Sequence, residues 1–107
     1  MEYLYVEKTE LIYTNISNPN PPTINISYDS ISTVFYGIYT RKMLFGIIKK
    51  PEMHIAILAS QGRFMITEHE VGQEKLDEYI EQLKDFCHRH HVTIRETTGD
   101  TKEDWRY

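Results

Sequence analysis

The 107 residues, about 12.7 kDa, suffice for one domain with a modest core and are too few for two ordinary domains. With 40% hydrophobic and 26% charged residues, the composition is that of a globular domain and excludes disorder over the whole chain. The net charge of −4 argues against a general nucleic-acid binder, although residues 36–63 carry a net +4 and residues 64–86 a net −5.

Residues 2–67 alternate between apolar and polar side chains, which is the period of β-strands. The proline-rich segment 17–22 is predicted to be a loop, because proline cannot donate to a β-ladder. Gly62 can supply the positive φ of a tight hairpin at residues 60–63. The short breaks between the strands predict antiparallel pairing. The predicted strands cover about residues 3–8, 11–14, 23–28, 33–40, 53–59 and 63–67.

After Gly72 the apolar period lengthens to three and four residues, which predicts one amphipathic helix over about residues 73–90. Acidic residues dominate the first half of this helix, and histidine and arginine close it, an order that complements the helix dipole. Residues 92–96 fit one further short strand, and residues 97–107 are predicted to be a polar tail. The predicted apolar stripe comprises Leu76, Tyr79, Ile80, Leu83, Phe86, Cys87 and His90.

Six or seven strands followed by a single helix predict a mainly β domain of the α+β class and not a βαβ fold. We expect a strongly bent antiparallel sheet, or a partly open barrel, that the C-terminal helix plugs. Residues 1–96 are predicted to form this single domain.

Residues 26–34, Ile-Ser-Tyr-Asp-Ser-Ile-Ser-Thr-Val, resemble the I-x-Y-x-x-I-x-x-V segment of bacterial pleckstrin-homology-like (PH-like, GRAM-related) domains. An opening hairpin, the sequence Leu44-Phe45-Gly46, later strands and a closing helix follow in the family's order, so the likeness spans about residues 3–88. The resemblance implies a PH-like barrel with a binding function. The first family strand is short or absent, and residues 92–96 follow the helix that would end the domain, so a different α+β sandwich stays open.

The segment 41–50 is the candidate binding site for an anionic partner. Two basic pairs flank an apolar stretch, each cation attracts anionic headgroups by ~1 kcal/mol, and Leu44 or Phe45 would insert into a bilayer. PH-like domains that bind phosphoinositides use basic residues near early strands, which agrees with this hypothesis. The alternative is an ordinary strand pair whose lysines guard an edge against aggregation. The candidate binding residues are Arg41, Lys42, Leu44, Phe45, Lys49 and Lys50.

The sequence offers weak candidates for metal binding or catalysis. Cys87 with His90 or His91 has the spacing of two metal ligands on one helix face, but no second motif completes a four-ligand site. The alternative is a core cysteine followed by polar helix-end histidines, and we expect no metal and no cofactor. Residues 68–70, Glu-His-Glu, have no partnered nucleophile in sequence and suit a charged connector before a helix, so we expect no enzymatic activity.

Aromatic residues suggest an interface. The strand containing Phe35, Tyr36 and Tyr39 is apolar on both faces, which favours either a partner surface or burial between the helix and the bent sheet. The aromatic end of the tail, residues 104–107, either docks on a neighbour or is loose.

The sequence therefore predicts a non-enzymatic binding or scaffolding module that presents an open strand edge to a protein, a peptide or its own copy in a homo-oligomer. The alternative function is peripheral binding to anionic membrane lipids through residues 41–50, and nucleic acid is not expected as a partner. The single cysteine fits a reducing compartment, and no basic signal region or long apolar run is visible, so we expect a cytoplasmic location.

Overall fold

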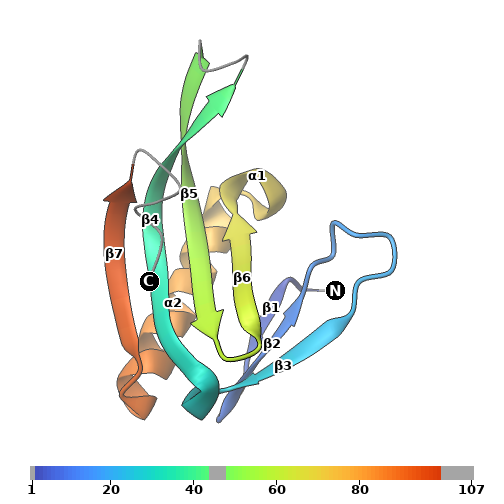
Figure 1. Ribbon diagram of the computed structural model, residues 1–107, viewed down its shortest axis with the longest axis vertical. Helices are drawn as coiled ribbons and strands as arrows, with labels where there is room; N and C mark the ends of the chain where they lie inside the picture. Colours follow the sequence, from blue (N-terminus) through green and yellow to red (C-terminus); the bar gives the residue numbers. More distant parts are fainter. Residues whose placement is uncertain (1, 44–47, 100–107) are drawn as a thin grey trace.

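The computed structural model describes residues 2–43 and 48–99, and its strands form two sheets (Figure 1). The first sheet has three antiparallel strands in chain order, and the predicted proline-rich loop joins the second strand to the third. Its strands are β1 (Leu4–Val6), β2 (Glu10–Thr14) and β3 (Thr23–Ser27).

The second sheet has four strands in the order β6-β5-β4-β7. The chain enters it through a 3-10 turn, η1 (Tyr28–Ser30), and continues through a long antiparallel hairpin into a third antiparallel strand. The predicted antiparallel pairing is confirmed for these three strands. The four strands are β4 (Ile31–Met43), β5 (Ile48–Ala59), β6 (Gly62–Thr67) and β7 (Thr93–Gly99).

β7 differs from the sequence prediction in length and in direction. A strand over residues 92–96 is expected from the pattern, whereas β7 extends to Gly99 and so includes residues 97–99 of the predicted tail. It pairs parallel with β4, with Thr33 opposite Thr93 and Tyr39 opposite Gly99. The direction follows from the preceding helix, which carries the chain back along the sheet so that β7 starts at the same end as β4.

Two helices separate β6 from β7. The short helix α1 (Glu68–Val71) begins after Thr67, whose hydroxyl accepts a hydrogen bond from the amide of Glu70. The long helix α2 (Gln73–His90) confirms the predicted helix, and it ends where His91 takes the left-handed conformation. Its buried residues are Leu76, Tyr79, Ile80, Leu83, Phe86 and Cys87, which were predicted from the apolar stripe.

α2 covers one face of the four-stranded sheet (Figure 1), and the core lies between this face, α2 and the three-stranded sheet. Leu11 and Ile26 of the first sheet, Ile55 and Ile57 of β5, and Leu83 of α2 are all at most 1% exposed in this core. The α+β class is therefore confirmed.

The predicted barrel is not confirmed, because the ladders among the described residues give two separate sheets. β2 and β6 belong to different sheets and form no backbone ladder with each other. The contact between them is a side-chain hydrogen bond, which the Tyr13 hydroxyl donates to the Met65 carbonyl at 2.8 Å. Within the described ranges, no helix is both long and apolar enough to cross a membrane.

Candidate functional site

The predicted basic segment lies on a two-stranded arm that extends beyond the rest of the sheet (Figure 1). β7 ends opposite Tyr39, and β6 ends opposite His54, whereas the β4–β5 ladder continues to the pair Met43 and Ile48. Leu44 and Phe45, the two candidate insertion residues, lie outside the described residues.

The register of this arm places like charges opposite each other. Arg41 pairs with Lys50, and Lys42 pairs with Lys49, with the backbone of these four residues described. Like charges at directly opposite positions of an antiparallel pair are destabilising.

The predicted aromatic interface is divided between the two faces of the sheet. Phe35 and the half-buried Tyr39 belong to a cluster on the face opposite α2, with Ala56, and the Arg95 guanidinium lies 5.9 Å from the Phe35 ring. Tyr36 packs against the main core instead, with the Lys84 ammonium 5.2 Å from its ring. One flat partner surface therefore cannot use all three predicted residues.

Of the three weak metal candidates, Cys87 and His91 line one surface cavity, whereas His90 lies against Tyr28. Cys87 is buried in the core, and this burial raises the pKa of its thiol to about 11. The His90 ring stacks on Tyr28, with ring centroids 4.3 Å apart, and its Nε2 lies 2.7 Å from the Lys8 carbonyl. Among residues 2–43 and 48–99 no cluster of three or more histidine, cysteine or acidic side chains is placed to hold a metal.

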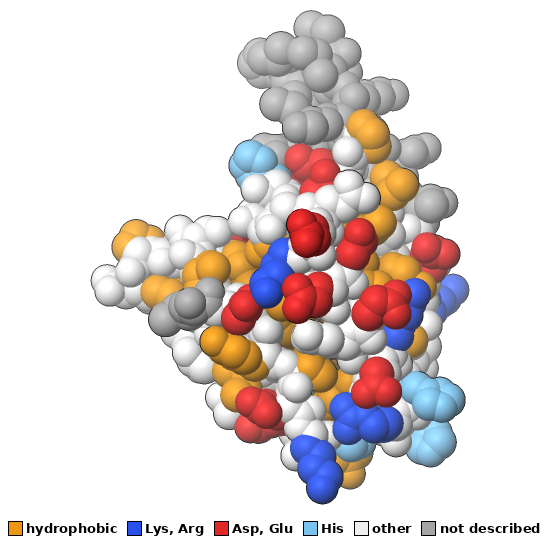
Figure 2. All heavy atoms as spheres, turned by 180° about the vertical axis from the view of Figure 1, so that it is seen from behind, with side chains coloured by type: hydrophobic (Ala, Val, Ile, Leu, Met, Phe, Trp, Pro, Cys, Tyr) orange, Lys and Arg blue, Asp and Glu red, His pale blue; other side chains and the backbone are white. Residues whose placement is uncertain are grey.

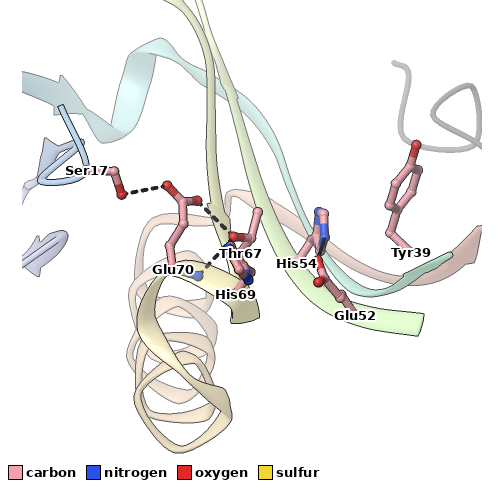
Figure 3. A pocket seen from close by; sticks show the side chains of 7 residues that line it. All are labelled: Ser17, Tyr39, Glu52, His54, Thr67, His69 and Glu70. Atoms are coloured by element: carbon pink, nitrogen blue, oxygen red, sulfur yellow. Dashed lines mark hydrogen bonds and ion pairs between the residues drawn. The ribbon is translucent and has the colours of Figure 1, made fainter. Parts of the chain in front are cut away.

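The structure brings together a polar pocket that was not predicted from sequence (Figure 3). Its volume is about 530 Å³, and its walls come from the β2–β3 loop, β4, β5, the end of β6 and α1. The lining residues are Ser17, Tyr39, Glu52, His54, Thr67, His69 and Glu70.

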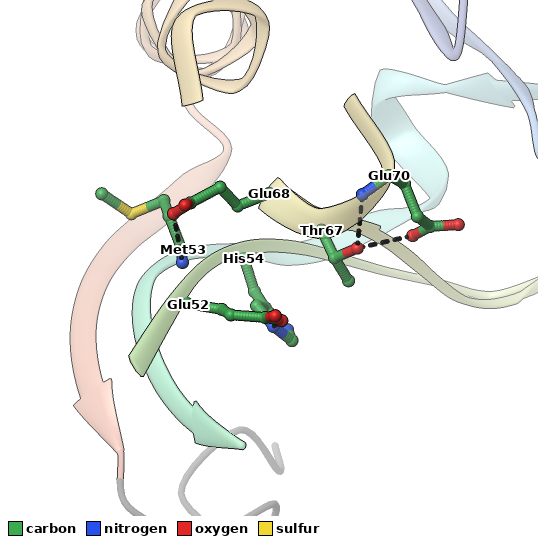
Figure 4. A network of polar contacts seen from close by, with 6 residues as sticks. All are labelled: Glu52, Met53, His54, Thr67, Glu68 and Glu70. Atoms are coloured by element: carbon green, nitrogen blue, oxygen red, sulfur yellow. Dashed lines mark hydrogen bonds and ion pairs between the residues drawn. The ribbon is translucent and has the colours of Figure 1, made fainter. Parts of the chain in front are cut away.

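A buried acid–histidine pair lies at one side of this pocket (Figure 4). His54 Nε2 and Glu52 Oε2 are 3.4 Å apart, and the two residues are 8% and 4% exposed. Nearby, the Glu68 carboxylate accepts a hydrogen bond from the Met53 amide, with the two atoms 3.1 Å apart. The alternation of β5 could have signalled this pair, because residues two apart on a strand share a face.

Glu70 organises the other side of the pocket through three hydroxyl groups. Tyr3 donates to Glu70 Oε2, Ser17 donates to the same oxygen at 3.1 Å, and Thr67 donates to Oε1 at 2.9 Å. Burial alone would raise the Glu70 pKa, but these hydrogen bonds outweigh it and lower the pKa below its ordinary value. Ser17 therefore faces a carboxylate anion, a contact that fixes its position within the loop.

A second, smaller cavity of about 330 Å³ lies between β1 and α2. We call it the β1–α2 groove. Lys75 joins its two walls by a 2.8 Å ion pair to Glu2, and the Tyr79 hydroxyl donates to the same carboxylate at 2.5 Å. The groove residues are Glu2, Leu4, Tyr5, Val6, Glu7, Lys75, Glu78, Tyr79 and Gln82.

Backbone groups of β1 point into this groove. The Glu7 amide donates to the Glu10 carbonyl at 2.9 Å, and the Thr14 amide donates to the Tyr3 carbonyl at 3.0 Å. Hydrogen-bonded pairs alternate along an antiparallel ladder, so the amides and carbonyls of Leu4 and Val6 point away from β2, toward α2. β1 is therefore an edge strand beside α2, and at its buried start the Leu4 backbone is hydrogen-bonded to the Tyr79 hydroxyl.

Comparison with protein-family models and with curated proteins finds no match for this chain.

Proposed function

We propose that this protein is a non-enzymatic binding module of PH-like type that takes an extended segment of another protein, or of a second copy, as an added strand. The observation that carries the proposal is that β1 is an edge strand of the three-stranded sheet, where the half-buried Val6 directs its amide and carbonyl away from β2. Main-chain hydrogen bonds to such an edge supply affinity, and flanking side chains supply specificity.

The wider fold supports the same proposal. Two sheets that enclose a core with one long helix support a PH-like arrangement. A cytoplasmic location is part of the proposal, on the basis of the single, buried cysteine.

The test uses a panel of blocked hexapeptides with alternating β-branched and polar residues, titrated into the isotopically labelled full chain. We expect the amide signals of Leu4 and Val6 to shift and the Val6 amide to become protected from hydrogen exchange. The matched controls are two versions of the same peptide, one N-methylated at its odd-numbered residues and the other at its even-numbered residues. Because a strand bonds through alternate residues on each edge, one set should abolish binding and the other should leave it intact.

Equal binding of the two N-methylated peptides would show that backbone pairing is not involved. If no peptide of the panel changes the signal or the exchange rate of the Val6 amide, the proposal is wrong. Light scattering over a range of concentrations tests the second copy as the occupant. In that case, protection of the Val6 amide should rise together with the solution mass.

A second candidate function is peripheral attachment to anionic membranes through the arm. It is favoured by the register of the arm, which sets Arg41 opposite Lys50 and Lys42 opposite Lys49. Anionic headgroups would relieve that repulsion, with ~1 kcal/mol from each cation near the surface.

Flotation with vesicles of phosphatidylserine and phosphatidylcholine tests this candidate. We expect salt-sensitive binding that is lost in the Lys49→Glu/Lys50→Glu variant. The matched control, Lys8→Glu/Lys84→Glu, makes the same change in net charge away from the arm and should still float. The same loss in both variants, or no flotation at low salt, would reject a membrane role for the arm.

A further inference from the structure

We propose that the outer face of the four-stranded sheet, the face opposite α2, is a docking surface for the chain's own residues 100–107, with Trp105 seated on its apolar cluster. These residues follow Gly99, the last residue of the described range. The inference goes beyond the proposed function and concerns a different surface, because the β1 edge belongs to the other sheet. The burial of the outer face, the length of the segment and its chemistry carry it.

The four-stranded sheet is apolar on both faces. On one face α2 and the three-stranded sheet form a second layer, and acidic side chains are spread over the surface that α2 presents to water (Figure 2). A sheet face that is apolar must be buried against another element, and here that layer is complete. The outer face carries an apolar cluster of its own, which comprises Phe35, Tyr39, Ala56, Leu58 and Met65.

The centre of the outer face has the burial of a covered surface. Phe35 is 5% exposed and Ala56 is 0% exposed. Two polar residues of β5 on the same face, Glu52 and His54, are 4% and 8% exposed. Side chains stand roughly perpendicular to a sheet, so lateral neighbours such as Arg95 enclose their sides, whereas only a second layer encloses their ends. This burial therefore indicates that a further segment covers β5 on this side.

The C-terminal segment begins beside this face. β7 ends at Gly99, opposite Tyr39 of the cluster, and eight residues follow in the sequence. Trp105 is the sixth of them, and six residues of extended chain span about 20 Å. Tyr39 and Phe35 are four residues apart on β4, a rise of about 13 Å. The segment is therefore long enough to carry the indole to the centre of the cluster.

The side chains of the segment suit this face. Trp105 and Tyr107 are two residues apart, so an extended segment presents both rings to the same side. Such rings bury large apolar areas and keep a polar atom for a hydrogen bond. Asp104 precedes Trp105, so an indole seated beside Phe35 brings a carboxylate close to the exposed Arg95.

Connectivity favours the chain's own segment over a segment of another molecule. Gly99 and Tyr39 are opposite each other in the β4–β7 ladder, so the tether to Trp105 is only six residues long. A short tether gives an effective concentration in the millimolar range, well above the concentration of a free chain in a dilute solution. The outer face is therefore assigned to residues 100–107 of the same chain.

Trp105 is the only tryptophan in the sequence, so fluorescence of the full chain reports on the segment directly. We expect its native emission to lie at a shorter wavelength than its emission in urea, and acrylamide to quench it several-fold less. Nuclear Overhauser effects should connect the indole protons to the methyl groups of Ala56, Leu58 and Met65. On dilution, neither the emission nor the solution mass from light scattering should change.

Two acidic substitutions separate this face from the sheet as a whole. Met65→Glu places a charge in the half-buried part of the cluster and should return the Trp105 emission to its value in urea. Circular dichroism and a cooperative urea transition check that this variant is folded. Ile38→Glu is the matched control, because Ile38 is 43% exposed and alternates with Phe35 and Tyr39 onto the other face of β4, and it should leave Trp105 shielded.

Native emission and quenching equal to those in urea would overturn the proposal. A shielded Trp105 without Overhauser effects to the cluster would overturn the assignment to this face, and this measurement on the unsubstituted chain decides even if Met65→Glu does not fold. Emission that moves to longer wavelength on dilution, together with a fall in solution mass, would show that a second copy supplies the segment and would overturn the same-chain assignment.

Discussion

Replacing Gly37 by alanine tests how closely β7 approaches β4. Gly37 lies in the middle of β4, opposite His54 on β5 and Thr97 on β7, with a φ of 145°. An alanine Cβ would be 1.8 Å from the Thr97 carbonyl oxygen, so β7 would have to move. Gly62 is a matched control, because its φ is 147° but its Cβ would meet nothing closer than a Phe64 ring atom at 3.9 Å.

The two substitutions should therefore differ by the cost of displacing β7. The positive φ strains an alanine at either position by about 1–3 kcal/mol. At Gly37, displacement of β7 also breaks at least two ladder hydrogen bonds, at roughly 1 kcal/mol each. We expect Gly37→Ala to lower the free energy of unfolding by about 2 kcal/mol more than Gly62→Ala, a further fall of roughly 10 °C in Tm for a domain of this size.

Urea denaturation of the two variants measures this difference, and hydrogen exchange locates it. In Gly37→Ala the amides of β7 should exchange faster, while those of the three-stranded sheet should not change beyond the global loss of stability. Equal losses of stability in the two variants, within about 0.5 kcal/mol, would refute the close parallel packing of β7 on β4.

Three further predictions concern the core. Leu83→Ala should cost about 3 kcal/mol in urea denaturation, because Leu83 is 1% exposed in the core, whereas Glu81→Ala at an exposed position should cost under about 0.5 kcal/mol; similar costs would mean that α2 is not docked. Burial raises the pKa of Tyr13 and Tyr79 to about 12, so the stability they contribute is complete below pH ~10 and is lost as the pH rises to about 12. Subtracting the absorbance titration of Tyr13→Phe or Tyr79→Phe from that of the unsubstituted chain isolates the ionisation of each tyrosine. Each should ionise at a higher pH in the native chain than in the unfolded chain, and a pKa of ~10 in both states would contradict their burial. Cys87 should react slowly with a thiol reagent at pH 8 and quickly in urea, and rapid reaction of the native protein would show that the thiol is accessible.

Local periodicity was enough to predict α2 and most strands. The three- and four-residue spacing from Leu76 to Cys87 defines one buried stripe, and the alternation around Ile26 defines one buried strand face. These features depend on neighbours in the chain, so the sequence contains them directly. The arm illustrates the limit, because its residues could be named from the sequence but its extension beyond β6 and β7 could not.

The polar pocket and the groove show what sequence reasoning could not reach. Glu52 and His54 are close in sequence and could have been paired by strand alternation, whereas Glu70 meets Tyr3 across 67 residues. The β1–α2 groove likewise joins Glu2 to Lys75. No local pattern specifies such long-range contacts.

The chain's own sequence determined the class of the domain, the position of its long helix, the apolar faces that form the core and the basic segment at the end of β4 and the start of β5. The tertiary structure decided the division into two sheets, the parallel direction of β7 and the placement of the β1 edge beside α2. The physical reason is that periodicity reports which face of an element is buried, while the partner it is buried against depends on how distant segments close around one core.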